Sequence, residues 1–430
     1  MVYKYNIAHR RKEYLNLLTI INLISGVLLA LFLAYQWIYV LLNFIKKPKR
    51  FPKADPQKYA VLISARNESN VIGNLINSIK KQDYPQELID IYVIADNCTD
   101  NTADVAKEAG AIVYERFNTE LVGKGFALNE MIHHIWNTVG QGVYNGYFVF
   151  DADNLLDINY ISEMNNAFCA GNRAVTSYRN SKNFSDNWIS ACSGTWLLRE
   201  SGQWNCARTM LGISSSMPGT GYLVAESMLI EDGGFISETM TEDIEFTYRW
   251  VARGERVAHC DDAIYYDEQP TSLKTSFNQL LRWSKGNIQC YLKYTGKLLK
   301  ACFSKNVLSC LDILLAILPA IVISLITLVV NLVVGIDLLQ KGELDLLGII
   351  PTLLLGLTSG YVMMFLMSLL VMITENHRIN CSWPKRILYS LCFPIYTVFY
   401  AFAVICSLFT KVKWKPIEHK STATIDDMKK

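Results

Sequence analysis

Two hydrophobic patterns divide the chain: long unbroken apolar runs near its ends, and short apolar runs between them. One long run covers Leu17–Phe44, and three more cover about Leu308–Val334, Leu346–Ile373 and Ile387–Phe409. Each is long enough to cross a bilayer as a helix. The first is too long for the apolar part of a signal peptide and lacks a small-residue cleavage site. The pattern therefore predicts one N-terminal and about three C-terminal transmembrane helices around a central domain.

The central domain has apolar runs of strand length, separated by segments with helical spacing. The expected strands are Tyr59–Ser64, Ile89–Ala95, Ala111–Tyr114 and Tyr147–Phe150, and the clearest expected helices cover residues 71–79 and 127–136. Strands that alternate with helices predict an α/β domain with a mostly parallel sheet and helices on both faces.

Polar clusters follow three of the expected strands, at residues 64–68, 96–100 and 151–153. In parallel sheets, ligands bind beyond the carboxyl ends of the strands. We therefore expect one ligand site where these three clusters meet.

Charge and composition indicate how the chain is oriented in the membrane. Basic residues directly follow the first long run and predict that this end is cytoplasmic; they are Lys46, Lys47, Lys49, Arg50 and Lys53. Four crossings would then place both basic termini outside, so one segment could instead be re-entrant or interfacial. Residues 277–299 mix lysine with aromatic residues, as in a helix that lies in the membrane interface. Asp312 lies either on a protein-lined face or at headgroup level.

These boundaries divide the chain into five parts. They are an N-terminal tail and anchor (1–50), the central α/β domain (51–275), an interfacial helix (276–305), a C-terminal membrane region (306–410) and a polar tail (411–430). The net charge of +2 gives no support for a nucleic-acid partner. The 11 cysteines contain no C-x-x-C pair and are expected to be reduced thiols.

Two carboxylates follow the fourth expected strand, in Asp151-Ala152-Asp153. At a strand end they could share a divalent cation and the diphosphate that it bridges. Oxygen ligands favour Mg²⁺ or Mn²⁺. Taken alone, such a pair is more often two loop acids, so the motif needs support from the rest of the chain.

A second acidic group, Thr241-Glu242-Asp243, stands at the start of an expected helix. Asp243 is either a helix cap or a general base that removes a proton from a sugar hydroxyl. Glu242 could fill the same role. Further on, helical spacing places Gln279, Arg282 and Trp283 on neighbouring turns. An arginine there could bind a diphosphate and an indole could stack on a sugar, or the helix could simply carry an aromatic membrane anchor.

The motifs together resemble those of membrane-integrated family 2 glycosyltransferases of the processive polysaccharide synthase type, which include cellulose, hyaluronan, chitin and poly-N-acetylglucosamine synthases. The matching segments, in the order of that family, are Ser64–Glu68, Ala95–Asp100, Gly123–Asn129, Asp151–Asp153, Gly219–Gly221, Thr241–Asp243 and Gln279–Trp283. The resemblance implies a GT-A-like domain between the predicted membrane helices.

The resemblance also implies a role for each matching residue. Those expected to bind the nucleotide sugar are Ser64, Arg66, Glu68, Asp96, Lys124, Asp151 and Arg282. Those expected to bind the acceptor are Gly219, Thr220, Gly221, Gln279 and Trp283. Asp153 and Asp151 would hold Mg²⁺ or Mn²⁺, and Asp243, with Glu242 beside it, would be the catalytic base.

The implied activity is an inverting hexosyl transfer from UDP-glucose or UDP-N-acetylglucosamine to the non-reducing end of a growing β-linked polysaccharide. Export through the chain's own membrane segments is expected, with the catalytic domain on the cytoplasmic side of the plasma membrane. The expected partners are the UDP-sugar, the polysaccharide, the bilayer and accessory membrane or export subunits. One alternative is a non-processive enzyme that adds one sugar to a lipid phosphate or oligosaccharide. Another is a membrane transporter with a regulatory nucleotide-binding domain.

Overall fold

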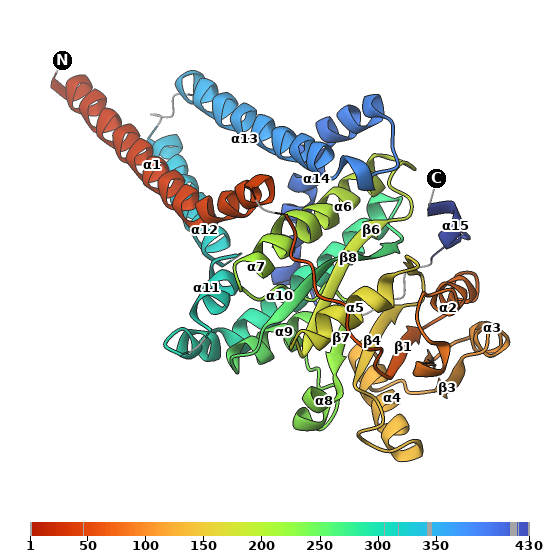
Figure 1. Cartoon of the computed structure of the whole chain (residues 1–430). Helices are drawn as coiled ribbons and strands as arrows, with labels where there is room; N and C mark the ends of the chain where they lie inside the picture. Colours follow the sequence, from red (N-terminus) through yellow and green to blue (C-terminus); the bar gives the residue numbers. More distant parts are fainter. Residues whose placement is uncertain are drawn as a thin grey trace.

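A sheet with helices on both faces lies at the centre of the computed structural model, and long helices from both ends of the sequence extend from one side of it (Figure 1). The structure describes residues 2–45, 47–304, 306–316, 318–341, 346–412, 419 and 421–428. Lys46, one of the basic residues that follow the first long run, lies outside these residues.

The first half of the sheet is parallel and consists of the four predicted strands. They are β1 (Tyr59–Ala65), β2 (Ile89–Asp96), β3 (Ile112–Arg116) and β4 (Gly146–Asp151), in the spatial order β3-β2-β1-β4. The intervening helices are α2 (Ile72–Lys80), α3 (Thr102–Glu108) and α4 (Lys124–Thr138), with a 3₁₀ turn η1 (Gln86–Leu88). The predicted α/β pattern is therefore confirmed, and the parallel strands bring their carboxyl ends to one edge.

The second half of the sheet is mixed. Its strands are β5 (Leu155–Leu156), β6 (Ala174–Ser181), β7 (Tyr222–Ala225) and β8 (Val257–Asp267). β7 is antiparallel to β4 and β6, and only β6 and β8 are parallel. Because β7 runs opposite to β4, Tyr222 pairs with Val149, and the residues just before β7 lie beside Asp151. This antiparallel strand is therefore what brings Gly219–Gly221 to the ligand edge.

Helices cover both faces of the sheet. The remaining ones in this domain are α5 (Tyr160–Cys169), α6 (Trp188–Leu198), the π-helix η2 (Arg199–Asn205), α7 (Cys206–Met210), α8 (Glu226–Asp232) and α9 (Glu242–Ala252). Alternate residues of each strand enter separate cores: Val61 and Phe150 pack under α2 and α5, whereas Leu62 and Tyr147 pack under α4 and α9. Two buried faces explain why the strands are almost wholly apolar.

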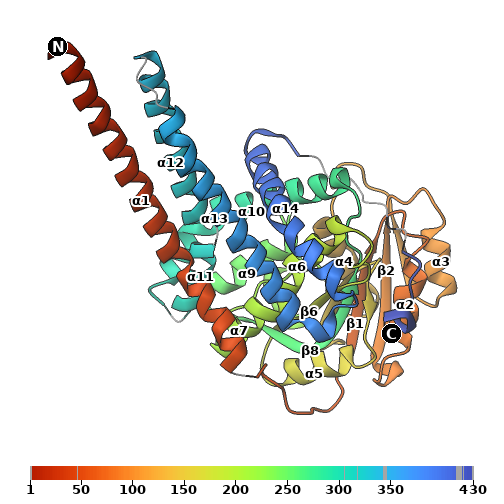
Figure 2. The ribbon, with the colours of Figure 1, turned by 90° about the horizontal axis from the view of Figure 1, so that it is seen from above.

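Four helices within the described residues contain segments long and apolar enough to cross a membrane. The segments are Leu18–Ile45 in α1 (Val2–Ile45), Val322–Gln340 in α12 (Leu318–Gln340), Leu354–Thr374 in α13 (Leu346–Thr374) and Trp383–Phe409 in α14 (Trp383–Phe409). This agrees with the prediction of one N-terminal and about three C-terminal helices. α1 and α12 run side by side (Figure 2), and the Asn22 side-chain amide donates to Asn331 over 3.0 Å.

The first predicted C-terminal run is shared between α12 and the shorter α11 (Val307–Ala316). Asp312 of α11 is buried, accepts a 2.7 Å hydrogen bond from the Tyr39 hydroxyl, and forms a 2.9 Å ion pair with Arg208. Asp312 therefore lies on a protein-lined face, as one of the two interpretations expects. An ion pair and a hydrogen bond offset the cost of burying its carboxylate.

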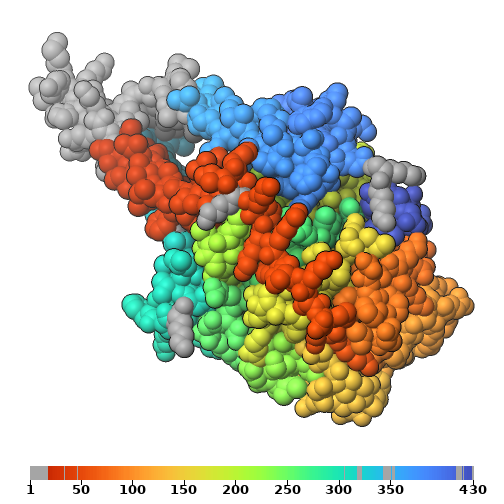
Figure 3. All heavy atoms as spheres, viewed as in Figure 1, coloured from red at the N-terminus to blue at the C-terminus, as the bar shows by residue number. Residues whose placement is uncertain are grey.

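Helix α10 (Leu273–Ala301) confirms the predicted helix at 277–299 and lies between α9 and α14. Its first turn is capped by Ser272, whose hydroxyl accepts from the Thr275 backbone amide over 3.1 Å. The segment from residue 47 to 58 runs over the surface of the domain from α1 to β1 (Figure 3). After α13, the 3₁₀ turn η3 (Asn376–Arg378) leads to α14, and the short α15 (Ile425–Met428) lies near α2 (Figures 1 and 2).

Candidate active site

The turn after β4 is fixed by contacts from two other parts of the chain. The Asp151 backbone amide donates to the Thr220 hydroxyl over 2.8 Å. The Asn154 side-chain amide donates to Asp267 over 2.9 Å, and an Asp153 carboxylate oxygen accepts from the Glu268 backbone amide over 3.0 Å. The two carboxylates predicted to hold a metal are therefore pre-oriented on a buried turn.

Lys124, the first residue of α4, enters the same site. Its ammonium group forms an ion pair with Asp151 and donates to the Gly219 carbonyl over 2.7 Å. The side chain is only 14% exposed. The predicted lysine therefore links the aspartate pair to the loop before β7, in a position to neutralise a negatively charged ligand.

Asp243 faces this loop from the first turn of α9. A Cβ atom added at Gly219, whose φ is +84°, would lie 3.7 Å from an Asp243 carboxylate oxygen, so the loop backbone passes directly in front of the acid. Burial raises the pKa of Asp243 and also that of its neighbour Glu242. A carboxylate with a raised pKa in a cleft has the properties of a general base.

Thr220 and Gly221 hold the loop against the neighbouring strands. Thr220 is fully buried, and its hydroxyl is used by the Asp151 amide. A Cβ atom at Gly221 would lie 2.3 Å from the Tyr265 ring, and its φ is +66°, so only glycine fits. Of the three predicted acceptor residues in this loop, Gly219 is the one whose backbone faces Asp243.

On the β2 side, Asp96 is paired with an arginine that the sequence motifs did not identify. Arg116 donates to Asp96 over 2.6 Å and to Glu130 over 2.7 Å, and its side chain is 1% exposed. Asp96 and Arg116 are register partners on β2 and β3, which is the pairing that the alternation of strands could have suggested. Ser64 is in register with Asp151 on the adjacent strand, so it also lies at this edge.

Glu68 has an unexpected partner from the far end of the chain. Its carboxylate lies 2.9 Å from His419 Nδ1, and its backbone amide donates to Thr102 over 2.8 Å. Burial raises the pKa of Glu68 to about 7. Arg66, half-buried two residues earlier, lies on the same turn. No local signal in the sequence marks His419.

Other C-terminal residues hold His419 in place. The Ser421 amide donates to Glu268 over 3.1 Å, and the Asn74 side chain donates to the Thr422 carbonyl over 3.3 Å. Lys81 and Asp426 form a 2.8 Å ion pair on the surface. The described residues of the predicted polar tail from 419 onward are thus packed against α2, the turn after β1 and the residue that follows β8.

On the membrane side, α10 contributes Gln279, Arg282 and Trp283, all half-buried. The Arg179 guanidinium lies 6.0 Å from the centre of the Trp283 indole and is ion-paired with Asp267 over 2.6 Å. Trp283 therefore connects to the aspartate turn through Arg179, which the sequence motifs missed. Within the described residues, Arg282 makes no hydrogen bond or ion pair, so the structure does not bring it into contact with Asp151 or Asp153.

The aspartate pair suits a hard divalent cation. Among the described residues no three side chains of His, Cys, Asp or Glu cluster as metal ligands. Mg²⁺ is commonly bound by one or two carboxylates together with substrate phosphates and water. Asp151 and Asp153 match that donor set, and the remaining ligands would come from a diphosphate and solvent.

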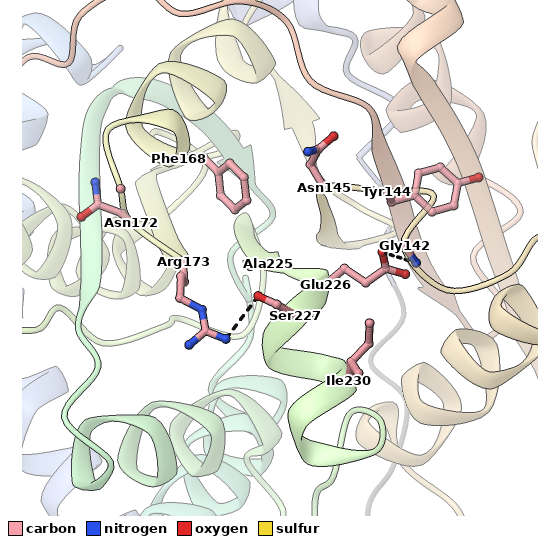
Figure 4. Close-up of a pocket in the computed structure, with 11 residues that line it drawn as sticks. Gly142, Tyr144, Asn145, Phe168, Asn172, Arg173, Ala225, Glu226, Ser227 and Ile230 are labelled. Atoms are coloured by element: carbon pink, nitrogen blue, oxygen red, sulfur yellow. Dashed lines mark hydrogen bonds between the residues drawn. The ribbon is translucent and has the colours of Figure 1, made fainter.

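A separate surface hollow lies at the other end of the sheet (Figure 4). Residues from three segments line it, including Tyr144, Phe168, Arg173 and Glu226. It lies beside the first residue of β4, Gly146, whereas the aspartates follow the last. The hollow is therefore distinct from the aspartate site.

The mixed sheet, the aspartate turn at its edge and the buried acid at the start of α9 define a glycosyltransferase of the GT-A fold. Residues 56–286 match the family described as glycosyltransferase like family 2, and the chain belongs to this family. This confirms the prediction of a glycosyltransferase rather than a transporter.

Similar proteins differ in what they make. Beta-monoglucosyldiacylglycerol synthase of Nostoc sp. (strain PCC 7120) is 26% identical over 56% of this chain and 51% of its own length. Poly-beta-1,6-N-acetyl-D-glucosamine synthase of Staphylococcus aureus (strain MSSA476) is 24% identical over 54% and 55%. The chain thus spans about half the length of the curated relatives it matches.

The fold also matches a solved structure over most of the chain. The mannosyltransferase PcManGT from Pyrobaculum calidifontis, in complex with GDP-Man and Mn²⁺, superposes with a TM-score of 0.58, at 16% identity, over 90% of this chain and 99% of the other. At this identity the likeness confirms the fold, with its helices as well as its sheet.

Proposed function

We propose that this protein transfers a hexose from UDP-glucose or UDP-N-acetylglucosamine, with inversion, to the non-reducing end of a β-linked polysaccharide. The observation that carries the proposal is the placement of Asp243, a buried acid with a raised pKa, across the Gly219 backbone from the Lys124–Asp151 pair. An inverting displacement needs a base on one side of the reacting carbon and a binding site for the diphosphate leaving group on the other.

The nucleotide would lie over the carboxyl edge of β1 and β2. Asp96, held by Arg116, and Glu68, held by His419, are the buried acids available to accept hydrogen bonds from uracil or ribose. Ser64 and Arg66 flank them. The diphosphate would extend toward Lys124, whose charge stabilises the leaving group as it develops.

Asp153 and Asp151 would hold a Mg²⁺ or Mn²⁺ ion. Such an ion, when bound, neutralises the diphosphate leaving group. Asp243 accepts the proton of the acceptor hydroxyl, which attacks the anomeric carbon on the face opposite the diphosphate. Its position in the first turn of α9 favours the carboxylate form through the helix dipole, which partly offsets burial. Glu242, the adjacent acid, is the alternative base.

On the acceptor side, Trp283 would stack on the terminal sugar, with Gln279 one turn earlier on α10. Trp283 packs in one apolar cluster with residues of α6, α13 and α14, so the acceptor site adjoins helices of membrane length. This continuity supports elongation coupled to export through these helices, with the catalytic domain on the cytoplasmic side of the plasma membrane. Accessory export subunits would attach to the membrane part.

The proposal is tested by the size of the product. Purified membranes are incubated with a panel of labelled UDP-sugars and Mg²⁺ or Mn²⁺, and the product is run on a gel before and after linkage-specific hydrolases. A ladder or smear of long chains supports a polysaccharide synthase. A single labelled species that extracts into organic solvent contradicts it.

The second candidate is transfer of one sugar to a lipid. Two observations support it: a relative at 26% identity is a monoglucosyldiacylglycerol synthase, and the acceptor side adjoins apolar helices. The extraction step of the same experiment separates the two, because a monoglycosylated lipid partitions into the organic phase.

A further inference from the structure

An arginine between two tryptophans stands out at the junction of α6 and η2. The Arg199 guanidinium lies 5.4 Å from the Trp196 indole centre and 4.3 Å from the Trp204 indole centre. Its side chain makes no hydrogen bond or ion pair with the described part of the chain, and its Nε atom is buried. Burial lowers the pKa of Arg199 to about 10, and no acid offsets this effect.

Four other buried or largely buried arginines are paired with acids. Arg116 is paired with Asp96, Arg179 with Asp267, Arg208 with Asp312 and Arg378 with Asp261, each within 3.0 Å. A largely buried charge without a partner is destabilising, and a cation–π contact offsets only part of that cost. The charge of Arg199 therefore calls for an anion from outside the described chain.

The surrounding polar groups have the chemistry of an anion site. The indole nitrogens of Trp196 and Trp204 are both buried without hydrogen-bond partners. Each is a donor only, so neither can be satisfied by a cation. The backbone here is a π-helix, a local widening that is found frequently at functional sites. A guanidinium with two unused N–H donors on one short segment matches the oxygens of a phosphate.

The position of the segment indicates where the anion comes from. Trp196 packs against Phe393 and Tyr400 of α14, with ring centres 5.6 and 5.9 Å away. Trp204 packs in one cluster with Tyr35 and Tyr39 of α1. Both helices are long and apolar enough to cross a membrane. Arg199 thus lies between two helices that lipid would surround, and tryptophan is common at the depth of lipid headgroups.

We propose that Trp196, Arg199 and Trp204 form a binding site for the phosphate group of an anionic membrane lipid, whose negative charge no cationic headgroup balances. The site adjoins the acceptor side of the catalytic pocket, because Trp196 shares an apolar cluster with Trp283. The proposed lipid site does not depend on which acceptor the enzyme uses. If the acceptor is a polysaccharide, the bound lipid seals the acceptor path. If the acceptor is a lipid, the bound lipid is a phosphate-bearing acceptor or its neighbour. The proposal therefore stands or falls separately from the proposed function.

The test compares lipids of different charge. The full chain is reconstituted in nanodiscs of phosphatidylcholine alone or with phosphatidylglycerol, and the apparent Tm is measured. Because a ligand that binds only the folded state stabilises it, phosphatidylglycerol should raise the apparent Tm by several degrees. Arg199→Gln should lose this increase and Arg199→Lys should keep part of it. Arg256→Gln is the matched control, since Arg256 is exposed and its side chain donates to the Gly212 carbonyl without pairing with an acid among the described residues.

An equal Tm in both nanodiscs, or an increase that survives in Arg199→Gln, would overturn the proposal. Inorganic phosphate is added to the detergent-solubilised protein as a further arm, and an equal increase there would show a free-anion site instead of a lipid site. If Arg199→Gln does not fold, native mass spectrometry of the unmodified protein decides: retention of phosphatidylglycerol over phosphatidylcholine supports the site, and equal retention contradicts it.

Discussion

Gly286 of α10 lies directly against Thr241, the residue that precedes α9. A Cβ atom at Gly286 would lie 2.5 Å from the Thr241 hydroxyl oxygen and 2.4 Å from its methyl carbon. The helix that carries Trp283 is thereby held against the turn that carries Asp243. The Gln289 side chain reinforces this contact by accepting from the Met240 amide over 3.0 Å. The helix that carries Trp283 and the turn that carries Asp243 are therefore packed as one unit.

Replacing Gly286 with alanine should disturb that unit. The added methyl group must displace Thr241, and overpacking of this kind costs about 1–3 kcal/mol. We expect a lower apparent Tm and a clear loss of transfer activity. Gly296→Ala is the matched control, because a Cβ at Gly296 on the same helix meets nothing within 4 Å. That variant should be neutral or more stable by about 0.5–1 kcal/mol. Equal behaviour of the two variants would refute the close contact.

The turnover rate should depend on the ionisation of Asp243. Burial raises the pKa of this acid to about 6, and only its carboxylate form can accept a proton. The value of kcat should therefore fall about tenfold per pH unit below this pKa and level off above it. Measurement at saturating UDP-sugar separates this effect from donor binding. A kcat that stays constant from neutral to acidic pH would exclude Asp243 as the base.

Arg116 should be essential to the fold on the β2 side. Arg116→Met leaves Asp96 buried without its cation, and breaking a buried pair from one side costs about 3–5 kcal/mol. We expect this loss in denaturant titrations, together with weaker UDP binding. The control is Lys107→Met, which removes the half-exposed pair with Glu115 and should cost less than about 1 kcal/mol. Similar losses in the two variants would contradict the role of the buried pair.

The sequence motifs identified most of the proposed site residues but few of the residues that hold them in place. The strand-end acids Asp151 and Asp96 could be found because a short apolar run followed by acids is a local pattern. Arg116 and Gly286 could not, since their importance comes from a neighbour on another element. His419 is the extreme case: it meets Glu68 across 351 positions of the sequence. The antiparallel strand β7 could not be predicted from the hydrophobic periodicity either, because it is only four residues long.

The C-terminal residues should contribute to donor binding. His419→Ala removes the partner of the buried Glu68, and one hydrogen bond to a charged group is worth about 1.5–3 kcal/mol. We therefore expect the KM for UDP-sugar to rise about tenfold or more, with a smaller effect on kcat. Asp426→Ala breaks the exposed pair with Lys81, away from Glu68, and should leave KM unchanged. An unchanged KM in His419→Ala would place this histidine outside the donor site.

The most direct test of the account is Asp243→Asn, measured for both sugar transfer and UDP binding. The amide cannot accept the proton, so transfer from labelled UDP-sugar should fall by a factor of about 10²–10⁴. UDP affinity, measured by calorimetry on the same preparation, should stay near that of the unmodified protein. Glu242→Gln is assayed in parallel as the alternative base. Substantial transfer by Asp243→Asn, with loss in Glu242→Gln, would contradict the assignment of Asp243 as the catalytic base.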